Sequence, residues 1–168
     1  MLQPRTYAAF VGSRYPEVMV TNAVVELTPW LETLELRELM RPLIGWRGGE
    51  PERDQEAIEQ VVDRYSRQTN LAGFVVVRES LLVGMIGIET TDQRHGIILH
   101  VVVASLLWRC GIGRLLIDSA TSRLELASLE AETDVDAVQF YANCGFAVRS
   151  LGEKYPGRER FLCVLEAQ

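Results

Sequence analysis

A turn shaped by two glycines is the clearest candidate for binding chemistry in the sequence. Residues 109–114 read Arg-Cys-Gly-Ile-Gly-Arg and follow the long apolar run 96–108. The first N–H groups of a helix lack partners within that helix and carry the positive end of its dipole, so they favour anions. The glycines leave room for a phosphate, and the two arginines supply donors for its oxygens. The spacing excludes a dinucleotide-binding loop and a P-loop, whereas a simple packing turn remains an alternative.

A second candidate segment, Asp134 to Phe146, begins 21 residues after Gly113. Asp134 is a typical capping residue for a short helix, in which Ala137, Phe140 and Tyr141 share one face. Gly145 is typical of the residue that ends such a helix. The pattern predicts a short helix that presents a tyrosine.

Together the two segments resemble the GNAT superfamily of N-acetyltransferases. Residues 103–116 are similar to the pyrophosphate loop that family members carry between the fourth strand and the third helix. Residues 134–146 are similar to the last-helix motif, and 82–88 (Leu-Val-Gly-Met-Ile-Gly-Ile) resemble the third strand. The resemblance extends from about residue 73 to residue 165, and the first seventy residues match only loosely.

The resemblance implies acetyl-CoA as cosubstrate and direct attack by a primary amine of a small molecule or peptide, without a covalent enzyme intermediate. The pantetheine arm would lie between two splayed parallel strands, expected at 97–104 and 128–133. A strand N–H near Val101 to Val103 would stabilise the oxyanion, and Tyr141 would protonate the departing thiolate. The residues expected to bind acetyl-CoA are Val101, Val102, Val103, Arg109, Cys110, Gly111, Ile112, Gly113, Arg114, Asp134 and Tyr141.

Three positions depart from the family pattern. Trp108 stands where the family has Gln or Arg, and Asp134 stands where many members have Asn. Ile97 occupies the place of a glutamate base that some members carry. Loss of that carboxylate leaves the general base open.

The candidates for that base are His100, our second catalytic candidate, then Glu89, Glu132 or a water molecule. The alternatives are a hydrogen-bonded core histidine and glutamates in solvent at strand ends. Tyr141 has its own alternative, a core aromatic with a bonded hydroxyl.

The acceptor amine is not identified by the sequence. In the family it is set by segments that correspond here to residues 39–53, with Trp46 and Arg47, and to the expected loop 152–160. The second segment offers Glu153, Lys154 and Tyr155. The alternative for both segments is a solvated loop. A competing function is a non-catalytic module that binds acyl-CoA as a sensor or partner-binding domain, and an acyl group other than acetyl is a third hypothesis.

The elements that position these residues follow from hydrophobic periodicity. Thr28 and Pro29 predict a helix start before residues 30–40, and Ile58 to Tyr65 form an amphipathic stripe. Strands are expected at 74–77, 82–88, 97–104, 128–133 and 161–165, with a helix from Ile112. This order predicts an α/β, mixed α+β fold of the GNAT type. Its sheet would be mostly antiparallel, with one splayed parallel pair and helices on both faces.

Composition sets outer limits. The chain has 168 residues, which predicts one domain over 1–168, and its net charge of −6 favours a cationic partner over nucleic acid. No apolar run is long enough for a membrane span, and the first twenty residues do not resemble a signal peptide. Three irregularly spaced cysteines predict reduced thiols in the cytoplasm and no metal site. The oligomeric state is open, a homodimer included.

Overall fold

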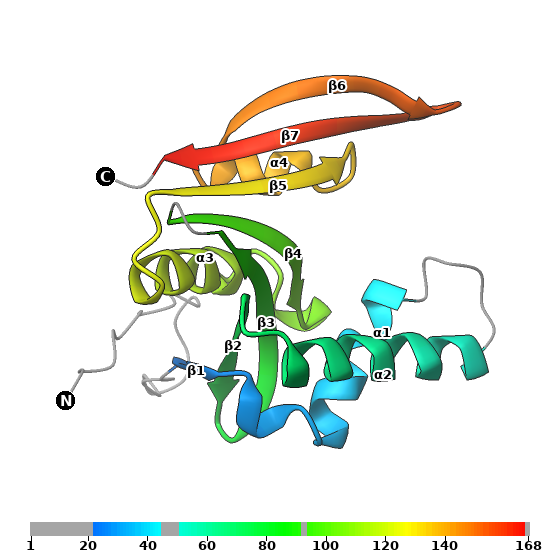
Figure 1. The fold of residues 1–168 in the computed structure, drawn as a ribbon, viewed down its shortest axis with the longest axis vertical. Helices are drawn as coiled ribbons and strands as arrows, with labels where there is room; N and C mark the ends of the chain where they lie inside the picture. The colour runs from blue at the N-terminus through cyan, green and yellow to red at the C-terminus, as the bar shows by residue number, and fades with distance from the viewer. Residues whose placement is uncertain (1–21, 45–50, 92–93, 167–168) are drawn as a thin grey trace, which may run out of the picture.

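A seven-stranded mixed sheet forms the centre of the computed structural model, which describes residues 22–44, 51–91 and 94–166 (Figure 1). Its strands are β1 (Asn22–Glu26), β2 (Leu71–Arg78), β3 (Leu81–Thr90), β4 (His95–Val103), β5 (Ser128–Asp134), β6 (Ala147–Tyr155) and β7 (Arg158–Glu166). The helices are α1 (Leu34–Ile44), α2 (Pro51–Arg67), α3 (Ile112–Arg123) and α4 (Val138–Asn143). Two 3-10 turns, η1 (Thr28–Trp30) and η3 (Ser105–Leu107), complete the described elements. The strand order is β1-β2-β3-β4-β5-β7-β6.

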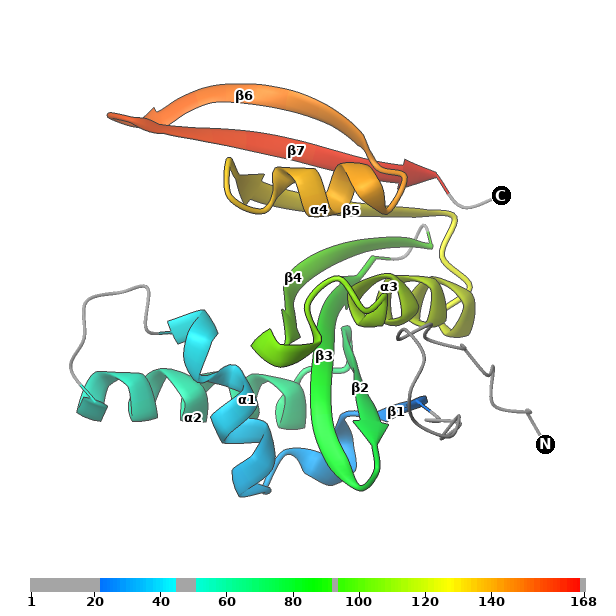
Figure 2. The ribbon, with the colours of Figure 1, turned by 180° about the vertical axis from the view of Figure 1, so that it is seen from behind.

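Helices cover both faces of the sheet, as the sequence predicted. The helices α1 and α2 pack on one face and form the α1/α2 layer, whereas α3 and α4 pack on the other and form the α3/α4 layer (Figures 1 and 2). Neighbouring residues therefore enter different cores, Val75 on the α1/α2 side and Val76 on the α3/α4 side. This explains why the central strands are apolar at nearly every position.

The only parallel pair of the described sheet is β4 with β5, and it is short. The two strands pair at His95–Ser128, Gly96–Leu129 and Ile97–Glu130, and no pairing continues beyond these residues. Figures 1 and 2 show β4 curving away from β5 after this contact. We use the name parting for this gap between the two strands, which begins after Ile97 on β4 and Glu130 on β5. The splayed pair predicted from the sequence is thus present.

The first helix begins later than predicted. Residues 28–30 form the turn η1, whose N-cap is Leu27, and α1 starts only at Leu34. The predicted capping role of Thr28 is wrong. That role belongs to Thr33, whose Oγ1 accepts a hydrogen bond from the Leu36 N–H at 3.3 Å. A second threonine five residues along offered the same capping chemistry.

Two strands were not predicted, β1 and β6. Both lie at edges of the sheet, and β1 has only five residues. The expected loop 152–160 is instead the end of the β6–β7 hairpin, which pairs Tyr155 with Arg158. Trp46 and Arg47 lie outside the described residues, as do the side chains of Lys154 and Tyr155.

The end of α4 matches its prediction better than its start. Gly145 has a φ of +95°, its N–H bonds to the Ala142 carbonyl, and the Phe146 N–H bonds to the Tyr141 carbonyl. These two bonds define a Schellman motif. At the other end the N-cap is Ala137, so Asp134 is not the capping residue that we predicted. Its Oδ1 instead accepts bonds from the N–H groups of Asp136 and Ala137 before the helix begins.

Candidate active site

The free edge of β4 is the first part of the site. The Ala104 N–H donates to the Val83 carbonyl at 2.9 Å, which makes Gly84 and Val103 a pair without hydrogen bonds between them. In an antiparallel ladder such pairs alternate with bonded ones. Val103 and Val101 therefore turn their N–H and C=O groups away from β3 and toward the parting, whereas those of Val102 face β3.

The loop after β4 brings a helix N-terminus next to this edge. Arg109 has a φ of +64°, and Gly111, the N-cap of α3, has a φ of +79°, a conformation in which glycine is unstrained. The first bond of α3 runs from the Leu115 N–H to the Gly111 carbonyl. The N–H groups of residues 112–114 thus have no partner within the helix, as an anion site requires.

The second glycine of the turn has a packing role. A Cβ on Gly113 would come within 2.6 Å of the Phe140 ring on α4. Glycine at this position therefore allows α4 to lie against the start of α3. The N-terminus of α3 and the helix α4 therefore pack together at this contact.

The side chains of residues 108–114 differ in the hydrogen bonds that they form. Arg114 donates a hydrogen bond to the Asn143 carbonyl at the end of α4, which uses one of its five N–H groups. Arg109 and Cys110 are exposed, and neither side chain bonds to another described residue, whereas the Cys110 N–H donates to the Leu107 carbonyl at 3.3 Å. Trp108 donates its indole N–H to the Val103 carbonyl at 2.9 Å.

Asp134 at the end of β5 lies near one positive charge. The Arg160 guanidinium lies 3.9 Å from its Oδ2 and 3.0 Å from the Glu132 carboxylate on the same strand. This single positive charge offsets part of the negative potential of the two carboxylates. Arg160 was not singled out from the sequence, because its partners lie on another strand.

Tyr141 lies on α4 in the α3/α4 core, with 8 % of its surface exposed. Its ring meets Phe140 and Phe146 edge to face, at centroid distances of 5.0 and 5.3 Å. Burial, followed by the nearby thiols Cys163 and Cys144, raises the pKa of its phenol. No hydrogen bond joins the hydroxyl to any residue that the structure describes. The phenol of Tyr141 is therefore neutral, and its proton is not donated to any described residue.

His100 lies on the opposite face of the sheet. Its Nε2 is 3.0 Å from the hydroxyl of Tyr65 on α2. Burial, assisted by the charge of Arg64, lowers the pKa of His100 to about 4. A neutral, hydrogen-bonded imidazole favours the core-histidine alternative over a general base.

The two candidate glutamates also have partners. Glu89 accepts a hydrogen bond from the Asn70 amide at 3.1 Å, and Glu132 pairs with Arg160. Neither carboxylate is available as an unengaged base.

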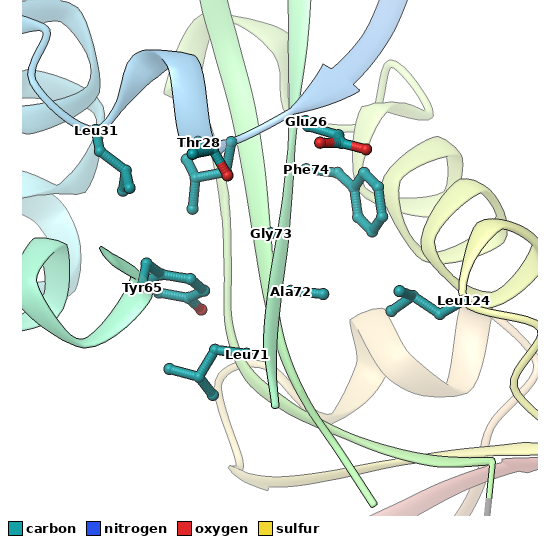
Figure 3. Close-up of a pocket in the computed structure, with 10 residues that line it drawn as sticks. Glu26, Thr28, Leu31, Tyr65, Leu71, Ala72, Gly73, Phe74 and Leu124 are labelled. Atoms are coloured by element: carbon teal, nitrogen blue, oxygen red, sulfur yellow. The ribbon is translucent and has the colours of Figure 1, made fainter. Parts of the chain in front are cut away.

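A cavity of about 200 Å³ lies apart from the parting, at the edge of β2 where β1 ends (Figure 3). It is lined by residues of β1, η1, α2 and β2, together with Leu124, and by none of residues 97–114 or 128–146. The described residues contain no group of three or more His, Cys, Asp or Glu side chains that could hold a metal. Nor does any helix in the described part of the chain have the length and apolarity needed to cross a membrane.

Comparison with known proteins agrees with this geometry. Residues 31–146 match the sequence model of the Acetyltransferase (GNAT) family. A search of curated proteins returned no match. The match and the fold define an acyltransferase enzyme. Within that class the chain belongs to the acetyltransferase (GNAT) family.

Solved structures share the fold at low sequence identity. A GNAT-family structure from Desulfovibrio desulfuricans has 18 % identity and a TM-score of 0.69, with 87 % of this chain and 99 % of that chain covered. PaiA N-acetyltransferase from Thermoplasma acidophilum, in complex with coenzyme A, has 16 % identity and a TM-score of 0.65, with 88 % and 99 % covered. A variant of the spermidine N-acetyltransferase SpeG from Vibrio cholerae has 19 % identity and a TM-score of 0.63, with 86 % and 93 % covered.

Proposed function

We propose that this enzyme transfers the acetyl group of acetyl-CoA to a primary amine by direct attack. The observation that carries the proposal is the free edge of β4, which faces the parting beside the N-terminus of α3. Coenzyme A in the PaiA structure and the spermidine specificity named for SpeG support the cosubstrate and the class of acceptor.

The residues of this chain suit the extended pantetheine arm of acetyl-CoA and the pyrophosphate that follows it. The Val103 N–H and the Val101 carbonyl offer a donor and an acceptor to the amides of a pantetheine arm, as a neighbouring strand would. The N–H groups of residues 112–114 and the guanidinium of Arg109 would bind the pyrophosphate. Cys110 lies in the same loop, and Asp134, held by Arg160, borders the parting at the end of β5.

Acetyl-CoA supplies an activated acyl group with a thiolate leaving group. Tyr141 would donate its proton to that thiolate, and the Val101 N–H would bind the oxygen on which negative charge develops. A neutral phenol suits this task because it holds its proton across the physiological pH range.

The amine would lose its proton to water. His100, Glu89 and Glu132 are each engaged by another side chain, and the low pKa of His100 makes it a weak base. The rate should therefore rise with pH as the acceptor amine deprotonates, with no limb set by His100.

The first test is titration of acetyl-CoA by calorimetry, followed by release of free CoA thiol in a panel of aminoglycosides, polyamines, amino acids and peptides. Binding with release of thiol in the presence of one amine class supports the proposal. Binding without release for any amine favours the non-catalytic module, and absence of binding contradicts both.

We further propose a cytoplasmic location, which three free thiols support. The net charge of −6 supports a cationic acceptor rather than nucleic acid as the partner. Light scattering on the purified chain would decide between a monomer and a homodimer.

A further inference from the structure

The Trp108 side chain is both largely exposed and held by a hydrogen bond. The residue is 67 % exposed, and yet its indole N–H donates to the Val103 carbonyl at 2.9 Å. Leu106, two residues earlier in the same loop, is 95 % exposed and forms no side-chain hydrogen bond. A large apolar ring is thus held in one place at the surface, although it buries little of its own area.

The carbonyl that holds the ring belongs to the free edge of β4. The Ala104–Val83 bond turns the backbone groups of Val103 toward the parting, so the indole approaches β4 from that side. It does so at the C-terminal end of the strand, where the chain turns toward the N-cap of α3. Trp108 therefore stands between the strand edge and the proposed phosphate cradle.

We propose that Trp108 is a cosubstrate-positioning residue, and this inference rests on the function proposed above. Its ring, anchored on Val103, forms an apolar wall along the pantetheine arm of an acyl-CoA thioester, at the end next to the pyrophosphate. A flat ring excludes water from the amide hydrogen bonds of the arm, which strengthens them.

This role explains a departure from the family pattern. The family has Gln or Arg at this position, and either side chain can supply an N–H donor. Trp108 keeps one donor and adds an apolar surface. The structure thereby separates two contributions, the anchor on Val103 and the wall offered by the ring.

The two contributions are tested by calorimetric titration of acetyl-CoA into matched variants. Trp108→Ala, which removes both, should weaken binding by about tenfold or more. Trp108→Phe, which keeps a ring and loses the anchor, should weaken it by about threefold. Leu106→Ala is the control, since it changes an exposed residue of the same loop that has no bond, and it should bind within about twofold of the wild type. Acetyl-CoA binding to Trp108→Ala with wild-type affinity would overturn the inference.

Tryptophan fluorescence reports on acetyl-CoA binding without turnover and in a protein whose Trp108 is intact. In a Trp30→Phe/Trp46→Phe background Trp108 is the sole tryptophan. Saturating acetyl-CoA should shift its emission to the blue and protect it from acrylamide. An unchanged spectrum, at concentrations where calorimetry shows saturation, would reject the wall and leave the proposed acetyl transfer intact. Failure of the wild type to bind acetyl-CoA would instead reject the proposed function, and this inference with it.

Discussion

Among the described side chains each layer contains one tyrosine, Tyr65 half-buried on α2 and Tyr141 buried on α4, and their hydroxyls differ in hydrogen bonding. In the α1/α2 layer the hydroxyl of Tyr65 is matched with Nε2 of His100. In the α3/α4 layer Tyr141 is surrounded by aromatic rings, and its hydroxyl has no partner among the described residues. Burial raises the phenol pKa in both cases. The shift in pKa therefore does not separate the two roles, whereas the hydrogen-bond partner does.

A glycine on β3 leaves the space that the Tyr65–His100 pair occupies. Gly87 on β3 is opposite His100, and a Cβ there would overlap the Tyr65 hydroxyl and lie 2.5 Å from Nε2 of His100. A glycine, a tyrosine and a histidine from three elements thus fit together around one hydrogen bond. Among the described residues no comparable arrangement holds the hydroxyl of Tyr141, as the proposed role of proton donor requires.

Tyr141→Phe should have the largest effect, on turnover. If the hydroxyl donates a proton to the thiolate, kcat should fall by about 100-fold or more, since general acids contribute that much. Stability should change by less than about 1 kcal/mol, because no bond within the described protein is lost. Initial rates of thiol release and calorimetric affinity for acetyl-CoA measure the two effects. An unchanged kcat would make Tyr141 a core aromatic like Tyr65.

Gly87→Ala should have the largest effect on stability. The added methyl would separate Tyr65 from His100 or displace β3, at a cost of about 3 kcal/mol in unfolding free energy. Chemical denaturation measures it. In the double variant Tyr65→Phe/Gly87→Ala the missing hydroxyl should relieve part of the clash, so the two costs should not add. Strict additivity would show that the glycine and the tyrosine are independent.

Acid should weaken the α1/α2 layer through His100. Burial lowers the pKa of His100 from 6.5 to about 4, so the unfolded chain takes up a proton at higher pH than the folded one. The unfolding free energy should therefore fall as pH drops from 6.5 to 4, by on the order of 3 kcal/mol, and level off below. His100→Gln should remove this part of the slope. A slope that persists in His100→Gln would assign it to carboxylates.

Tyr65→Phe should lower stability less than Gly87→Ala or acid does. It leaves Nε2 of His100 without its partner, which should cost about 1–2 kcal/mol of stability. Because Tyr65 has no part in the proposed chemistry, kcat should stay within about twofold of the wild type. A loss of kcat at unchanged stability would transfer the catalytic role to the α1/α2 layer.

The smallest expected effect concerns alkaline pH, where kcat should not decline. Burial raises the pKa of Tyr141 above its ordinary value of 10, so the phenol stays protonated below that pH. In a steady-state profile from pH 7 to 10, with an amine acceptor, kcat should therefore show no decline. A decline that disappears in Tyr141→Phe would mean that the phenol ionises in the complex.

The α3/α4 layer was largely predictable from sequence, because its signals are local. The glycines around Ile112 and the Asp134–Phe146 segment each carry their pattern within a few residues, and the structure places them beside the parting of β4 and β5. The cap of α1 and the strands β1 and β6 were not predicted. Several threonines offer a cap, and an edge strand with one neighbour shows weak alternation.

The contacts that define the chemistry of the α1/α2 layer are not local. Tyr65 and His100 are 35 residues apart, and Tyr65 appeared in the sequence only as one member of an amphipathic stripe. Outside this layer, the charge of Arg160 near Glu132 and Asp134 is also non-local, whereas the bond from Trp108 to Val103 spans five residues and depends on the turn between them. The residue types indicate which hydrogen bonds and ion pairs these side chains can form, whereas the folded structure determines their partners.

The short pairing of β4 with β5 has a mechanical consequence. Only three residue pairs join the strands, and His95 reinforces the contact through Ser128 at 2.7 Å and Glu130 at 3.9 Å. The described sheet therefore has an unpaired strand edge in its own interior. If the proposed acetyl-CoA site is correct, the pantetheine arm would pair with this edge as an added strand and link the two halves of the sheet. Acetyl-CoA at a concentration of 100 times its Kd should therefore raise the unfolding free energy by about 2.7 kcal/mol.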